Sequence, residues 1–147
     1  MDRTLVAALA TVVVGSLIAL QAPINSGLGK AVGTLPAAAI SFTIGTILLL
    51  GLVIVSGNLG NLSEAANVRW YYLLGGMLGA AYVTTVLLTV RTLGAGGVTA
   101  ATVAGQLTAS LVIDRVGMLG LEETPITLTR VIGVVLLFAG TVLVIRT

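Results

Sequence analysis

The chain of 147 residues is 57% hydrophobic and only 8% charged, with a net charge of +2 and a mean hydropathy of +1.16. Because a soluble domain is about a quarter charged, this composition excludes a soluble enzyme or nucleic-acid binder. The sequence contains no Cys and no His. Disulfides, thiolate or imidazole metal ligands and the usual triad base are therefore excluded. We expect no enzyme activity, no catalytic residue, no cofactor, no metal and no nucleic-acid partner.

Five apolar stretches are long enough to cross a bilayer, which takes about 20 mostly apolar residues. They cover residues 4–28, 34–56, 69–90, 95–114 and 126–145. Leu35-Pro36 opens the second stretch, and Gly94-Ala95-Gly96-Gly97 separates the third from the fourth. The runs are continuously apolar, without the alternation of a membrane β-barrel. The sequence therefore predicts an all-α integral membrane protein, with residues 1–147 forming a single five-helix domain.

The first stretch also resembles the apolar part of a signal peptide, with Arg3 on its flank. However, the apolar run is too long and no small-residue cleavage pattern follows it. We therefore interpret it as a retained first helix.

Lys and Arg are divided almost equally between the two ends of the expected helices. With five spans, one side holds Arg3, Arg69, Arg115 and Arg130, and the other holds Lys30, Arg91 and Arg146. A difference of four against three gives little orientation under the positive-inside rule. The chain either inserts one way with a weak bias or inserts both ways up. The odd number of spans favours dual topology, since two opposed five-helix copies form an inverted-repeat pair.

Polar residues within the first span lie on one helix face. Gln21 and Asn25 are four residues apart, and Pro23 lies between them in sequence but points to the opposite side. Because Pro removes a helical hydrogen bond, we expect a kink beside the two amides. The amides indicate either the wall of a polar cavity or contacts that hold neighbouring helices together.

The fourth span carries a polar stripe at about 100° per residue. Its members are Thr99, Thr102, Gln106, Ser110 and Asp114. Gln106 lies near the middle of the span, where an unpaired amide is most costly. This stripe is interpreted as a cavity lining, with packing against a neighbouring helix as the alternative.

The second and third spans add further candidates. Ser41 and Gly45 share a face beside Phe42, and Tyr82 lies deep in the third span. Trp70-Tyr71-Tyr72 is typical of an aromatic belt at the membrane surface.

Small residues indicate where helices approach closely. Gly75-x-x-x-Gly79 in the third span and the pair Gly133 and Gly140 in the fifth are interpreted as packing seams, one of them at a dimer contact. No Asp or Glu lies at the centre of any span. This absence disfavours a proton-coupled exporter of organic cations.

Two segments resemble a known bacterial family. They are Gln21-Ala22-Pro23-Ile24-Asn25-Ser26-Gly27-Leu28-Gly29, followed by Ala39-Ile40-Ser41-Phe42-Thr43-Ile44-Gly45-Thr46, and the string from Ala104-Gly105-Gln106-Leu107 through Ser110-Leu111 and Asp114 to Gly117. The sequence is similar to the YdcZ-type branch of the drug/metabolite transporter superfamily. The resemblance implies a five-helix unit that pairs into a ten-helix transporter in the bacterial inner membrane. The matching polar residues are Gln21, Asn25, Ser41, Gln106, Ser110 and Asp114. The chain lacks the first-helix carboxylate of small multidrug exporters in that superfamily.

The leading interpretation is a secondary transporter of small molecules that works as an antiparallel homodimer by alternating access. Its expected substrate-binding residues are Gln21, Asn25, Ser41, Tyr82, Gln106 and Ser110. The expected partners are a second copy or an oppositely oriented paralogue, a small-molecule substrate and membrane lipids. The alternatives are a passive dual-topology channel and a lipid-binding or assembly protein that transports nothing. A channel should show a continuous polar path or a charged ring, which the sequence does not indicate.

Overall fold

A computed structural model describes residues 2–117 and 121–146 of the chain. These residues fold into helices with connecting turns, without a strand among them. The helices form two compact units, Met1–Arg91 and Thr92–Thr147. The all-helical class and the long apolar helices that the sequence predicted are therefore confirmed.

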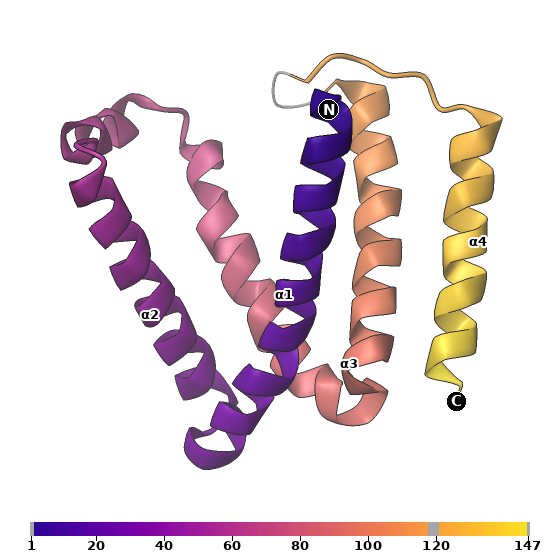
Figure 1. Ribbon diagram of the computed structural model, residues 1–147, viewed down its shortest axis with the longest axis horizontal. Coiled ribbons are helices and arrows are strands. Elements are labelled where there is room, and N and C mark those ends of the chain that lie inside the picture. The colour runs from indigo at the N-terminus through magenta and orange to yellow at the C-terminus, as the bar shows by residue number, and fades with distance from the viewer. Residues whose placement is uncertain (1, 118–120, 147) are drawn as a thin grey trace. The chain divides into compact units, whose positions relative to one another are not determined.

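The first unit begins with two long helices joined at a single glycine. Helix α1 covers Arg3–Val32 and helix α2 covers Thr34–Val55. Gly33 between them has φ +90°, a conformation that glycine adopts without steric cost. Asp2 caps α1 by accepting a hydrogen bond from the Thr4 amide at 3.1 Å. The chain thus reverses direction within one residue, and α2 runs back at an angle to α1, so that the two helices diverge away from Gly33 (Figure 1).

The two prolines of these helices have different consequences. Pro36 lies in the first turn of α2, where its missing N–H costs no helical hydrogen bond. Pro23 lies inside α1, which nevertheless continues to Val32 as a single helix. With 30 residues, α1 is roughly 45 Å long. It therefore exceeds a hydrocarbon core of about 30 Å and must tilt or extend beyond it.

The connection after α2 is more ordered than a plain loop. It contains two 3₁₀ helices, η1 (Leu59–Asn67) and η2 (Trp70–Leu73). The expected aromatic belt falls on η2, where Arg69 donates a hydrogen bond to the Tyr71 hydroxyl at 2.8 Å. The third span therefore starts its α-helix at Leu74, five residues later than predicted from the sequence.

The third and fourth expected spans are continuous in the chain as helix α3 (Leu74–Val116). A straight helix of 43 residues would be roughly 65 Å long, about twice the hydrocarbon thickness. Gly94, with φ +69° and ψ +168°, is the one residue inside α3 with non-helical dihedral angles. It divides α3 into residues 74–93 and 95–116, each roughly 30 Å long. The sequence placed the break in this glycine-rich segment and began the fourth span at residue 95, which is where the second helical segment begins.

Small residues let three helical segments of the first unit meet. Ala37 and Ala38 of α2 form the buried cluster with Val83 and Leu87 of α3, and Leu28 and Tyr82 pack against it. A Cβ atom built on Gly29 of α1 would lie 3.5 Å from Leu87 Cδ2 and 3.7 Å from Ala37 Cβ. Close approach of this kind is how helices associate in lipid, where burial of apolar area gives little driving force.

The second unit pairs residues 95–116 of α3 with helix α4 (Leu128–Ile145). A Cβ atom built on Gly97 would lie 3.4 Å from Ile145 Cγ1, and Thr141 Oγ1 donates to the Ala100 carbonyl at 3.2 Å. At the other end, Arg130 contacts Asp114. These contacts pair later residues of one helix with earlier residues of the other, so the two run antiparallel and side by side (Figure 1).

Candidate functional site

A groove opens between α1 and α2 in the first unit, halfway along both helices. It has a volume of about 210 Å³. Its lining combines three polar and three apolar positions: Gln21, Ser41, Phe42, Gly45, Thr46 and Leu49. The antiparallel return of α2 brings Gln21 of the first helix opposite residues 41–49 of the second. Two of the six expected site residues, Gln21 and Ser41, therefore line one groove.

The polar side chains of the groove are not engaged by the described part of the chain. Within it, Gln21, Ser41 and Thr46 make no side-chain hydrogen bond, although Ser and Thr in a helix can donate to a carbonyl one turn earlier. Thr43 on the same helix does this, with its hydroxyl donating to Ala39 O at 2.8 Å. The groove thus presents free donors and acceptors in an apolar helix pair.

A larger hollow of about 400 Å³ lies beside the groove. It is lined by α1 alone: Val14, Leu17, Ile18, Leu20, Gln21 and Ile24. A single helix cannot enclose a ligand, and Gln21 is the one polar residue of this lining. The two-helix groove is therefore the better candidate site, and Gln21 is the residue that the two linings share.

Two other expected site residues lie in packing contacts of the first unit. Asn25 is only 6% exposed and shares one face of α1 with Ala22, Ser26 and Gly29, all buried. Gly29 is the member of this face that meets α2 and α3. Tyr82 is half-buried against the Ala37–Leu87 cluster. Neither residue lines the groove, so the structure separates them from Gln21 and Ser41.

The last two expected site residues lie in the second unit. Gln106 is exposed, and Ser110 is half-buried with its hydroxyl donating to Leu107 O at 2.9 Å. At about 100° per residue, Gln106 points about 120° away from Ala100, which faces α4. The Gln106 amide therefore has no partner in α4, whereas the Ser110 hydroxyl is already bonded within its own helix.

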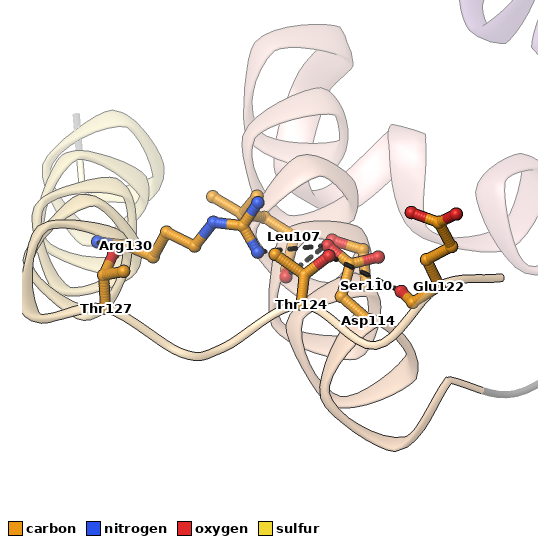
Figure 2. Close-up of polar contacts among 7 residues, drawn as sticks. All are labelled: Leu107, Ser110, Asp114, Glu122, Thr124, Thr127 and Arg130. Atoms are coloured by element: carbon orange, nitrogen blue, oxygen red, sulfur yellow. Dashed lines mark hydrogen bonds and ion pairs between the residues drawn. The ribbon is translucent and has the colours of Figure 1, made fainter.

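An ion pair closes the polar stripe at the end of α3. Arg130 Nη1 donates to Asp114 Oδ2 at 3.2 Å, and both side chains are a little over one third exposed. Figure 2 shows Arg130 reaching from α4 toward Asp114, with Ser110 one turn earlier on α3. The pair neutralises an arginine in the first turn of α4, where the helix dipole disfavours a cation.

The segment before α4 supports this ion pair. The Thr124 amide donates to the Asp114 carbonyl at 2.8 Å, and the Thr127 hydroxyl caps α4 by accepting from the Arg130 amide at 3.3 Å. Arg115 and Glu123 approach to 3.8 Å on the exposed side of the same turn. Asp114 is thus held as a structural joint between the two helices of the second unit.

Sequence reasoning identified Ser41, Phe42 and Gly45 as neighbours but did not include Thr46 and Leu49. These positions follow from the same helical spacing, because residues 41, 42, 45, 46 and 49 share one face. The Asp114–Arg130 pair was also missed. Its signal is weaker, since the two residues are 16 apart and meet only when the helices pack antiparallel.

No group of three or more Asp, Glu, Cys or His side chains that could hold a metal occurs among the described residues. The polar groups of the groove are neutral amide and hydroxyl groups. This arrangement can bind a small molecule by hydrogen bonds.

Comparisons with known proteins give one clear result. A search of curated proteins and a search of solved structures each found no match. The family model described as "Putative inner membrane exporter, YdcZ" matches residues 6–143, which is nearly the whole chain. The apolar helices agree with the multi-pass inner-membrane location that this description gives. The chain therefore belongs to the YdcZ family of the drug/metabolite transporter superfamily.

Proposed function

We propose that the chain is a secondary transporter of small molecules, and that two copies in opposite orientations form the working unit. Membership of an exporter family supports transport across the inner membrane in general. The observation that carries the proposal is the α1–α2 groove, which holds unbonded Gln21, Ser41 and Thr46 halfway along two apolar helices. Polar groups at such depth are costly unless they serve a binding site.

The pairing of opposed copies rests on the charges and on the glycines. The nearly equal Lys/Arg count leaves insertion weakly directed. Gly133 and Gly140 of α4 have no atom of the described chain within 4 Å of an added Cβ, in contrast to Gly29 and Gly97. They are therefore free to form a close helix contact with a second copy. Two opposed copies would form the inverted repeat on which many transporters are built.

In an alternating-access mechanism, the unpaired Gln106 amide of the second unit would line the substrate cavity. Gln106 points away from α4 and lies in the middle of its helical segment. In the proposed dimer it faces the cavity shared by the two copies. Substrate would then meet free amides and hydroxyls from both copies near the bilayer midplane and be released as the copies rock.

Solute counterflow in liposomes tests the function. Purified protein is first screened for solutes that raise its unfolding temperature, because a ligand stabilises the state that it binds. The most stabilising solute is then measured as labelled solute entering liposomes preloaded with the unlabelled form. A transporter gives saturable uptake that the internal solute accelerates. Uptake that only follows the gradient without saturation indicates a channel, and either that result or no uptake contradicts the proposal.

A further inference from the structure

We propose that the α1–α2 groove selects an uncharged small molecule with a flat apolar body and a hydrogen-bonding end. This inference deepens the proposed function, on which it rests, by naming the chemical class of the substrate. It is carried by three properties of the groove: its free hydrogen-bonding groups, its lack of charge, and its shape.

The groove offers hydrogen bonds of both kinds at one place. The Gln21 amide has two N–H donors and an acceptor oxygen, and the Ser41 and Thr46 hydroxyls each donate and accept. None of the three is used within the described part of the chain. A ligand with a donor and an acceptor would satisfy groups that otherwise remain unpaired in an apolar setting, and such pairing is strongly favoured there.

Charged groups of the first unit lie away from the groove, at the ends of its helices or in their connections. They are Asp2, Arg3, Lys30, Glu64, Arg69 and Arg91. The charged groups nearest to Gln21 along α1 are the Arg91 guanidinium, whose Nη2 lies 3.4 Å from a Cβ built on Gly29, and Lys30. At the helical rise, Gly29 and Lys30 are about 12 and 13 Å from Gln21. An ion placed among neutral amides and hydroxyls would lose its hydration without gaining a counter-charge. The groove therefore disfavours both cations and anions.

The apolar part of the lining gives the groove its shape. The Phe42 ring lies against Gly79, where a built Cβ would be 3.4 Å from Phe42 Cζ. Glycine at this position lets the ring lie close to α3, and 37% of Phe42 stays exposed. Leu49 and the bare backbone of Gly45 complete the apolar wall. A flat apolar group can pack against the ring while its polar end reaches the amide and hydroxyls.

The size of the groove favours a small ligand. A volume of about 210 Å³ corresponds to roughly seven water molecules at about 30 Å³ each. Drug-sized ligands occupy pockets of about 300 Å³ or more. The groove of one copy is therefore suited to a molecule with a single small ring.

Three molecules of nearly equal size and shape separate charge from shape: benzamide, benzamidinium and benzoate. At neutral pH the first is uncharged, the second is a cation and the third is an anion. Binding of each to the full chain in lipid nanodiscs is measured by saturation-transfer NMR, with empty nanodiscs as the blank. We expect benzamide to bind, and the two ions to bind at least about tenfold more weakly.

Two variant pairs locate the binding in the groove. Gly45→Leu places a side chain in the groove, where nothing lies within 4 Å of an added Cβ, and should abolish benzamide binding. Gly51→Leu on the same helix meets equally open space outside the groove and should bind normally. Thr46→Val should weaken benzamide about three- to tenfold by removing one hydrogen bond. Thr43→Val, whose hydroxyl is bonded to Ala39 O, should leave the affinity unchanged.

The proposal is overturned if benzamide fails to bind at millimolar concentration, if either ion binds as tightly, or if Gly45→Leu binds benzamide normally. Counterflow separates this failure from failure of the proposed function. If benzamide binds selectively in the groove but no stabilising solute is transported, the binding site is supported and the proposed transport function is contradicted. If a charged solute shows saturable flux that Gly45→Leu does not affect, the proposed transport function is supported and the proposed substrate class is contradicted.

Discussion

The two units use polar side chains in opposite ways. In the first, Gln21, Ser41 and Thr46 line a groove and make no hydrogen bond within the described chain. In the second, Asp114 pairs with Arg130 and Thr141 bonds to Ala100 across the helix interface. Polar side chains therefore remain unbonded in the groove of the first unit, whereas in the second they join two helices.

Fixing the orientation of the chain in the membrane should reduce transport more than any other change, because it should affect both units of every copy. If opposed copies supply each other's missing half, two Lys appended after Thr147 should favour one orientation and abolish transport when that variant is expressed alone. Ala65→Lys with Ala66→Lys in exposed η1 should fix the opposite orientation and also abolish transport. Co-expression of the two variants should restore it. C-terminal reporter fusions measure the orientations, and counterflow measures the activity.

A native chain that reports from one side alone would contradict pairing with itself. The groove and the ion pair would then have the same orientation in the membrane in every copy of the chain. The remaining possibilities would be a parallel assembly or pairing with an oppositely oriented paralogue.

Gln106 is the exception to the contrast, because it lies in the second unit yet has no partner in α4. We expect Gln106→Leu to fold normally, since Leu suits both lipid and helix packing, and to lose at least about tenfold in transport if the amide lines the shared cavity. Thr108→Val is the matched control on the same helix, because Thr108 already donates to Ala104 O. Counterflow and the unfolding temperature are measured on both variants. Normal transport by Gln106→Leu would remove this residue from the site.

The sequence predicted the long apolar helices because continuous apolar runs of this length favour helices in lipid. It placed the start of α2 correctly at Thr34 and the end of α4 at Ile145. The third helical segment continues to residue 93, three residues beyond the expected end of the third span, because one residue with positive φ, Gly94, is enough to interrupt the helix. The late start of α3 came from the 3₁₀ turn of η2, which apolar periodicity does not distinguish from an α-helix.

The site was harder to predict than the spans. Gln21 and Asn25 lie about 40° apart on α1, so helical spacing alone groups them together. The structure separates them because the small residues Ala22, Ser26 and Gly29 direct the packing toward the Asn25 side. Tertiary packing decides which side of a helix a neighbouring helix covers. The sequence of that helix alone does not show which side this is.

That separation predicts different consequences for the two amides. Asn25→Leu adds bulk to a tightly packed face and should destabilise the fold by about 1–3 kcal/mol, as overpacking does elsewhere. Gln21→Leu lies in an open groove and should leave stability nearly unchanged while weakening ligand binding. The unfolding temperature in detergent and the benzamide affinity are measured for both. Equal losses of stability would place both residues in the packing and weaken the assignment of the groove.

The smallest effect is expected at the ion pair of the second unit. Asp114 and Arg130 are each a little over one third exposed, and pairs of this exposure contribute about 1 kcal/mol or less. Asp114→Asn and Arg130→Gln should each lower the unfolding temperature by a few degrees and leave ligand affinity at the α1–α2 groove unchanged. The double variant should be no less stable than the worse single variant, because the second substitution removes a charge already left without its partner. Additive losses would mean that each residue has a separate partner. A loss of ligand binding at the α1–α2 groove in either variant would contradict the proposed difference between the units, in which the first binds the ligand and the ion pair of the second only holds two helices together.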